Sequence, residues 1–109
     1  MKQSVNLYQF REAFRLVGRE DQFTYEGLEV LFDYLEEYED STGEEIELDV
    51  IALCCEYSED SYEVIADNYS IDTSQATDPE EVREIVREFL ERHTQVCGKV
   101  DGGLVYQQF

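Results

Sequence analysis

Apolar residues in the first part of the chain recur at helical spacing. Residues 5–17 form an amphipathic segment, with Ser4 as a possible N-cap and Gly18 as its end. A second helix is predicted to begin after Thr24 and to run to about Asp40, where a Ser-Thr-Gly sequence ends it. The apolar stripes of the two helices are Leu7, Phe10, Phe14 and Val17, and Leu28, Leu31, Phe32 and Leu35.

The apolar period changes to two at residue 45. Acids alternate with apolar residues from Glu45 to Val50, and the chain is then mostly apolar as far as Tyr57. This pattern is typical of a central strand that is covered on both faces in its second half, so the main strand is predicted over residues 45–57. A short buried helix from Val50 is the alternative, because periodicity does not separate the two over so short a run.

The clearest helix start lies in the C-terminal third of the chain. Asp78 is placed as the N-cap, Pro79 at the first helical position and Glu81 where it can complete a capping box. The core face, which continues through about His93, consists of Val82, Ile85, Val86, Phe89 and Leu90. Glutamates and arginines share the remaining positions, so the outer surface of this helix is expected to be roughly neutral.

Shorter elements complete the predicted fold. Ser61 can cap a short helix over residues 62–69. Residues 95–100 and 104–109, on either side of Asp101-Gly102, predict a β-hairpin. We therefore predict one α+β domain of 109 residues, with about four helices and an antiparallel three-stranded sheet in the order αα-β-αα-ββ.

Charge is distributed unevenly along the chain. The 27 acidic and 8 basic residues give a formal net charge of −19, well beyond the magnitude of about 2–8 that suffices for the solubility of a small domain. Residues 20–82 contain 22 of the acids and no lysine or arginine. Because apolar residues are interleaved with these acids, we expect a folded anionic surface rather than a disordered tail. A cationic partner is expected, whereas direct binding to nucleic acid or to a membrane is disfavoured because both require positive charge.

The second predicted helix displays its acids as a stripe at i, i+4, i+7 and i+11. A helix of about 17 residues is about 25 Å long and places carboxylates about 5–6 Å apart along it, a spacing comparable to that of phosphates on one DNA strand. Further acids follow in the loop and at the start of the predicted strand. The candidate partner-binding residues are Glu26, Glu29, Asp33, Glu36, Glu37, Asp40, Glu44, Glu45, Glu47 and Asp49. The alternative is an ordinary solvated helix face, although like charges at i,i+4 destabilise a helix and need compensation.

Six tyrosines lie within the same acidic stretch. They are Tyr25, Tyr34, Tyr38, Tyr57, Tyr62 and Tyr69. Tyrosine is amphipathic and frequent in protein interfaces, but partial burial at the edge of the core is the simpler interpretation for about half of them. Tyr34 and Tyr38 lie on the side of the second helix away from the acids, which favours the core edge for these two.

Catalytic and metal-binding chemistry finds little support. Paired carboxylates carry no information about glycosidase activity in so acidic a chain. His93 could act with Cys97, but the helix is predicted to end between them. One of Cys54 and Cys55, which would point to opposite faces of a strand, gives only three zinc ligands with His93 and Cys97. An EF-hand would need an acid at Tyr38. We therefore expect a protein without enzymatic activity, metal or cofactor; a metal-dependent enzyme that uses His93 and a cysteine is the remaining alternative.

The chain also predicts its cellular location. Three cysteines without a framework spacing favour free thiols in a reducing cytosol. No apolar run approaches the length of about 18 residues that a membrane span needs. The first residues lead into an amphipathic segment, so no signal peptide is expected.

The segment from Leu31 to Glu59, LFDYLEEYEDSTGEEIELDVIALCCEYSE, resembles a stretch found in small acidic proteins encoded by phages and mobile elements. In size and charge the whole chain is similar to phage anti-defence proteins that imitate DNA, including acidic anti-CRISPR and anti-restriction inhibitors. These inhibitors share charge rather than a fold.

The resemblance implies a DNA-mimicking inhibitor, active in the cytoplasm of a bacterial host cell as a monomer or small homo-oligomer. Its acidic face would block the Lys/Arg-lined DNA-binding channel of a host protein, with a CRISPR effector complex as the first expectation. The alternative of a different class is an acidic adaptor or regulator that docks on a basic host protein without competing with DNA.

Overall fold

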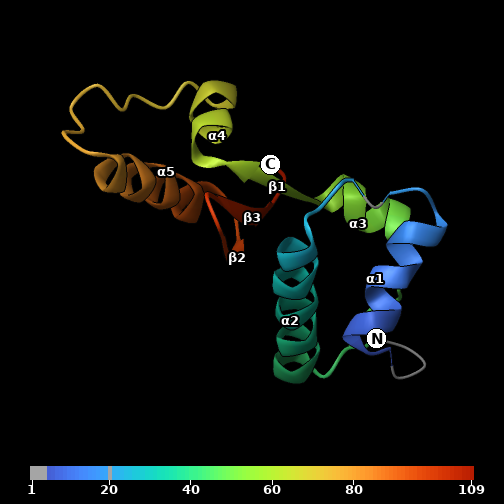
Figure 1. Ribbon diagram of the computed structural model, residues 1–109. Coiled ribbons are helices and arrows are strands. Elements are labelled where there is room, and N and C mark those ends of the chain that lie inside the picture. Colours follow the sequence, from blue (N-terminus) through green and yellow to red (C-terminus); the bar gives the residue numbers. More distant parts are fainter. Residues whose placement is uncertain (1–4, 20) are drawn as a thin grey trace.

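The computed structural model describes residues 5–19 and 21–109 (Figure 1). Its elements in chain order are α1 (Leu7–Leu16), α2 (Tyr25–Thr42), α3 (Val50–Glu56), β1 (Tyr57–Ser61), α4 (Tyr62–Asn68), α5 (Pro79–His93), β2 (Val96–Val100) and β3 (Gly103–Gln107). The predicted α+β class with an antiparallel three-stranded sheet is confirmed. The order differs from the prediction by one helix, because the described residues include α3 between α2 and the first strand.

Capping side chains fix the starts of the first two helices. The Asn6 side chain accepts a hydrogen bond of 2.8 Å from the Gln9 N–H, and the Gln9 side chain accepts from the Asn6 N–H at 3.0 Å. Asn6 is therefore the cap of α1, and the predicted cap, Ser4, lies outside the described residues. Thr24 caps α2 as predicted, with its hydroxyl oxygen 2.9 Å from the Gly27 nitrogen.

Gly43 at the end of α2 and Asp78 at the start of α5 are confirmed as predicted, whereas the predicted capping box of α5 does not form. Gly43, at φ 72°, ends α2 in the left-handed conformation that glycine adopts without strain. Asp78 caps α5 through the Glu81 N–H at 2.8 Å. The Glu81 carboxylate does not return to the Asp78 backbone; it accepts instead from the N–H and hydroxyl of Thr77. The Glu81 side chain therefore binds the residue before the N-cap, whereas in a strict capping box it would bind the backbone of the N-cap itself.

The sheet has the order β1-β3-β2, which makes β3 its central strand. Val105 belongs to the core that α1, α2 and α3 cover, whereas Leu104 and Tyr106 belong to the core under α4 and α5. Figure 1 shows the two groups of helices on opposite sides of the sheet. The strand with both faces covered is therefore β3, near the C-terminal end, and not the segment predicted from residue 45.

The predicted strand over residues 45–57 is wrong, and the helical alternative from Val50 is correct. Residues 44–49 lie outside any helix or strand, and α3 follows. Val50, Leu53 and Cys54 are buried at helical spacing, and the Asp49 side chain accepts from the Ala52 N–H at 3.1 Å to cap the helix. Burial at i, i+3 and i+4 is the helical pattern, so this apolar run forms a helix and not a strand.

The first strand is instead the polar segment Tyr57–Ser61, which pairs antiparallel with Gly103–Gln107. Its side chains are bound to other elements: Ser58 accepts from Gln108, and Asp60 accepts from the Tyr106 hydroxyl at 2.6 Å. Hydrogen bonds rather than an apolar pattern hold this edge strand, so hydrophobic periodicity did not reveal it. None of the described helices combines the length and the hydrophobicity that crossing a bilayer requires.

Candidate partner-binding surface

The ten predicted partner-binding residues form one set, which we call the acidic band. It consists of Glu26, Glu29, Asp33, Glu36, Glu37, Asp40, Glu44, Glu45, Glu47 and Asp49. Nine of them are exposed, and Glu36 is partly buried. Six come from α2 and four from segment 44–49, which joins α2 to α3, so the band depends on how these two segments are placed.

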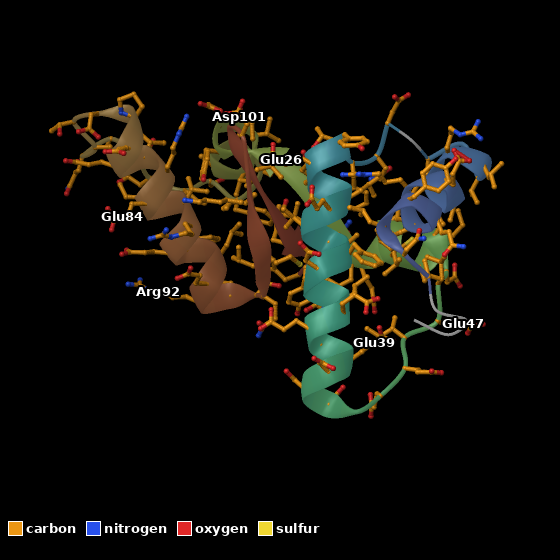
Figure 2. The ribbon with its side chains drawn as sticks, turned by 60° about the horizontal axis from the view of Figure 1, so that its bottom comes forward. Glu26, Glu39, Glu47, Glu84, Arg92 and Asp101 are labelled. Carbon is orange, nitrogen blue, oxygen red and sulfur yellow. The ribbon has the colours of Figure 1, made fainter. Side chains whose placement is uncertain are left out.

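The first arm of the band follows α2, whose 18 residues correspond to a length of about 27 Å. Leu31 and Leu35 are buried on the inner face of this helix. On one flank Val30 lies so close to Gly98 of β2 that a Cβ at Gly98 would clash with it, and on the other the ring of Phe32 is 5.3 Å from that of Phe10. The carboxylates therefore project between two packed flanks, away from the core (Figure 2).

The second arm is the segment that leaves the C-terminal end of α2. Glu39 accepts a hydrogen bond of 2.7 Å from the Ile46 N–H, which ties the segment back to the helix. Ile46 and Leu48 pack against the core while the acids between them stay exposed. In Figure 2, Glu47 lies toward α1 and Glu26 lies at the opposite end of α2, beside the hairpin. The band thus has two arms that meet at the C-terminal end of α2, and it does not lie on one flat face.

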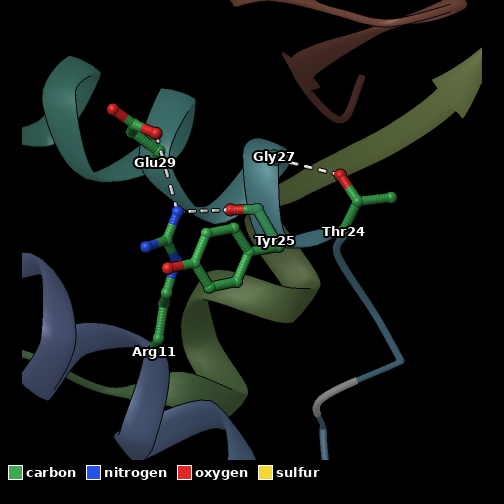
Figure 3. A network of polar contacts seen from close by, with 5 residues as sticks. All are labelled: Arg11, Thr24, Tyr25, Gly27 and Glu29. Atoms are coloured by element: carbon green, nitrogen blue, oxygen red, sulfur yellow. Dashed lines mark hydrogen bonds and ion pairs between the residues drawn. The ribbon is translucent and has the colours of Figure 1, made fainter.

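One arginine contacts the band from α1. The Arg11 guanidinium is 3.6 Å from a carboxylate oxygen of Glu29, donates to the Tyr25 carbonyl at 2.7 Å and lies 3.3 Å from the centre of the Tyr25 ring (Figure 3). The Arg11 side chain is 16% exposed and that of Glu29 54%, so Glu29 still faces solvent and the ion pair is weak. For band members other than Glu29 and Glu36, the described part of the chain brings no lysine or arginine within ion-pair distance.

The charges of α2 oppose its own helix dipole at the C-terminal end. Glu37 and Asp40 lie in the last two turns, and the last turn contains no basic residue. The C-terminal end of a helix carries partial negative charge, so carboxylates there are destabilising. In α5 the arrangement is the favourable one, with Glu80 and Glu81 in the first turn and Arg92 in the last. Helix stability therefore does not explain the acids of α2.

Compensation comes from the N-terminal end of α2. Glu59 of β1 accepts from the Thr24 N–H at 2.8 Å and from the Thr24 hydroxyl at 2.7 Å. This places a carboxylate at the positive end of the helix dipole. A Cβ at Gly27 would collide with the Glu59 carboxylate, so a larger residue at this position would displace that carboxylate from Thr24. The network links α2 to the edge of the sheet and holds the first arm in place.

Some acids of the base-free stretch serve the fold and not the surface. Glu59 and Asp60 are partly buried and hydrogen bonded, so the surface exposes less negative charge than the acidic stretch of the sequence contains. Conversely, sequence analysis missed Asp101, whose N–H lies 3.4 Å from a Glu26 carboxylate oxygen and which adds an exposed acid beside the first arm (Figure 2). Asp101 was recognised only as a turn residue, and its proximity to α2 is a tertiary contact without a local signal.

The residues considered for catalysis or metal binding are separated. Cys54 and Cys55 lie on α3, so the expectation that they occupy a strand is wrong; Cys54 is buried and Cys55 exposed. The His93 ring lies tilted against that of Phe89, with ring centres 4.4 Å apart and the planes at 42°. Burial raises the pKa of the Cys97 thiol to about 12, which keeps it protonated and weakly nucleophilic. Among the described residues, no three His, Cys, Asp or Glu side chains are grouped so that they could hold a metal ion.

No protein-family model, curated protein or solved structure matches this chain.

Proposed function

We propose that this protein is a non-enzymatic inhibitor that imitates DNA. Its acidic band occupies the lysine- and arginine-lined DNA channel of a bacterial defence complex, with a CRISPR effector complex as the first candidate. The observation that carries the proposal is a folded array, drawn from a stretch of sequence without lysine or arginine, in which nine of ten carboxylates are exposed. Spacings of about one helical turn along α2 resemble a run of backbone phosphates.

The position of the acids on α2 supports a cationic partner. Repulsion between neighbouring carboxylates and with the C-terminal end of α2 destabilises the free protein. Lysine and arginine side chains in a DNA channel would relieve both effects on binding. The net charge of −19 would also speed the encounter with a basic channel, an effect that increasing salt weakens.

The test is competition for DNA. Labelled DNA is bound to the candidate effector complex and displaced by this protein over a salt series from about 50 to 300 mM, a range in which phosphate-like contacts lose most of their strength. We expect the apparent affinity of the inhibitor to fall as salt rises. Inhibition that does not change across the series would contradict charge mimicry.

Two variants with equal charge make the test specific to the band. Asp33→Lys/Asp40→Lys reverses two charges on the first arm, and Glu84→Lys/Glu88→Lys reverses two exposed charges on α5. We expect the first variant to release the DNA site and the second to remain an inhibitor. Equal loss in both variants would mean that total charge, and not the band, is responsible.

The same experiment identifies the alternative function. An acidic adaptor would bind the effector complex through the band and leave its DNA affinity unchanged. Direct binding measured alongside DNA displacement therefore separates the two: binding with displacement supports the mimic, and binding without displacement supports the adaptor.

A further inference from the structure

A cavity of about 480 Å³ opens between α2, the second arm, α3 and the start of β1, on the side of α2 that faces away from the carboxylates of the first arm. Its wall includes Tyr34 and Tyr38 from α2, Ile46 from the second arm, Glu56 from α3 and Tyr57 at the start of β1. This volume is within the range of about 300–1,000 Å³ that ligand sites in proteins occupy. We call it the tyrosine pocket.

The tyrosines form the floor and the lip of the pocket. Tyr57 is 8% exposed and meets Tyr34 edge to face, with ring centres 6.0 Å apart at 67°. Tyr38 is 44% exposed and stands at the opening. Burial raises the pKa of Tyr34 and Tyr57 above the ordinary value, so their hydroxyls remain protonated at neutral pH. The pocket therefore presents neutral aromatic rings.

The charge of the pocket has one sign. Glu56 is its only charged lining residue, and no lysine or arginine occurs in the chain segments that supply the tyrosines, Ile46 and Glu56. Gln95 and Gln107 are the other polar residues of the wall besides the tyrosines. Aromatic faces attract cations, and carboxylate and amide oxygens accept hydrogen bonds from them.

We propose that the tyrosine pocket receives one arginine side chain of the basic partner, which anchors the complex next to the second arm of the acidic band. This inference rests on the proposed function, because it specifies the chemistry of the partner at that surface. A planar guanidinium is weakly hydrated and stacks on aromatic rings, whereas the lysine ammonium is a compact and strongly hydrated charge. Buried arginine and tyrosine contacts also supply much of the binding energy in protein interfaces.

The protein already contains an arginine held in this manner. Arg11 lies with its guanidinium 3.3 Å from the centre of the Tyr25 ring and donates to a carbonyl oxygen beside it (Figure 3). That site is filled from within the chain. The tyrosine pocket offers aromatic rings and oxygen acceptors of the same kind, but its lining contains no arginine of its own.

The pocket can be tested without a partner. The probes are N-acetyl-arginine amide, its lysine counterpart and its citrulline counterpart, which keeps the shape of arginine without the charge. Chemical shifts of the ¹⁵N-labelled protein are followed during each titration. We expect saturable shifts at the amides around the pocket with the arginine probe, and binding at least about fivefold weaker with the other two.

Variants locate the site. Tyr38→Ala removes a partly exposed ring without touching the buried floor, and we expect it to weaken arginine binding about 3–10-fold. Tyr25→Ala, at a tyrosine that is 76% exposed and outside the pocket, serves as the control and should leave binding unchanged. Equal binding of citrulline, shifts confined to α2 away from the pocket, or equal effects of the two variants would overturn the proposal. Self-association that protects these amides would identify a second copy of the chain as the occupant and would also overturn it.

Failure of the pocket and failure of DNA mimicry give different results. The titration contains neither DNA nor effector, so it can fail while competition for DNA succeeds, and the reverse also holds. In the competition assay, Tyr38→Ala should lower affinity with little change in its salt dependence, because cation–π contact in a partly closed site is screened less than exposed charge. Asp33→Lys/Asp40→Lys should reduce the salt dependence itself.

Discussion

Removing two carboxylates from α2 is expected to stabilise the protein. Asp33 has acids of the same helix at i−4, i+3 and i+4, which are Glu29, Glu36 and Glu37. Asp40 has Glu36 and Glu37 at i−4 and i−3 and also lies in the last turn, where no basic residue compensates it. The variant Asp33→Asn/Asp40→Asn therefore removes five like-charge pairs and one unfavourable interaction with the helix dipole.

The magnitude follows from these six interactions. A like-charge pair at this spacing costs about 0.2–0.5 kcal/mol, and a carboxylate at a helix C-terminus costs about 0.3–1 kcal/mol. Asparagine and aspartate have nearly the same helix propensity, so the exchange itself adds little. Because Arg11 partly neutralises Glu29, the free energy of unfolding of the double variant should rise by about 1–3 kcal/mol at low ionic strength.

Urea unfolding followed by circular dichroism measures this change. The midpoint of the variant should exceed that of the natural chain in dilute buffer, and most of the difference should vanish in about 1 M salt, where the Debye length is about 3 Å. Glu91→Gln changes the charge in the same direction but removes the Arg87–Glu91 pair of 3.7 Å on α5, so it should instead lose about 0.3–0.5 kcal/mol. A double variant that gains no stability at low salt, or gains as much at high salt, would refute electrostatic conflict in α2.

Three shorter predictions concern the scaffold. Gly27→Ala forces a Cβ into the Glu59 carboxylate and should cost about 1–3 kcal/mol in urea unfolding; Glu59→Ala in the same chain should recover part of the loss, and a neutral Gly27→Ala would contradict the contact. Burial raises the pKa of Cys97 to about 12, so the stability it contributes is present below the unfolded value of about 8.5 and is lost as pH rises toward about 12; Cys97→Ala should flatten urea midpoints measured between about pH 8 and pH 11, and an unchanged slope would reject this assignment. Exposed Cys55 should react with a thiol reagent well before buried Cys54, which mass spectrometry of the digested protein would show, and equal rates would mean that α3 opens readily.

The helices that could be located from sequence are those with chemistry at their ends. Thr24 and Gly43 bound α2, and Asp78 with Pro79 starts α5, because each residue satisfies or removes a backbone group that the helix leaves unpaired. The apolar pattern alone fails at Val17. This residue continues the apolar stripe of α1 but is 50% exposed, because the helix ends before it. Local chemistry therefore predicts boundaries better than a single apolar position does.

The first strand was missed because its stability is not local. Glu59 and Asp60 are polar, and their partners, Thr24 and Tyr106, are 35 and 46 residues away in the chain. The strand was instead predicted over the apolar run before Tyr57, because a continuous apolar run is also typical of a buried strand. No periodic signal distinguishes a hydrogen-bonded polar strand from a loop.

The exposure of the acidic band was predictable, whereas its shape was not. Charge composition and the helical stripe indicate which carboxylates face solvent. The bend between the arms depends on Gly43 and on the Glu39–Ile46 hydrogen bond, and the tyrosine pocket arises where α2 meets α3 and β1. Tyr34 was expected at the core edge and is partly buried there, but its pairing with Tyr57 required the tertiary structure.

The placement of the acids separates two uses of the same chemical group. Asp49, Asp78 and Glu59 sit at helix N-termini, where a carboxylate contributes to stability. Asp33 and Asp40 lie where a carboxylate opposes it, and solubility alone would be served equally well at either kind of position. If Asp33→Asn/Asp40→Asn both stabilises the protein and weakens its inhibition of DNA binding, the unfavourable acids are accounted for by the partner. If stability rises and inhibition persists, the first arm does not contact the channel, and the second arm with its tyrosine pocket must carry the interaction.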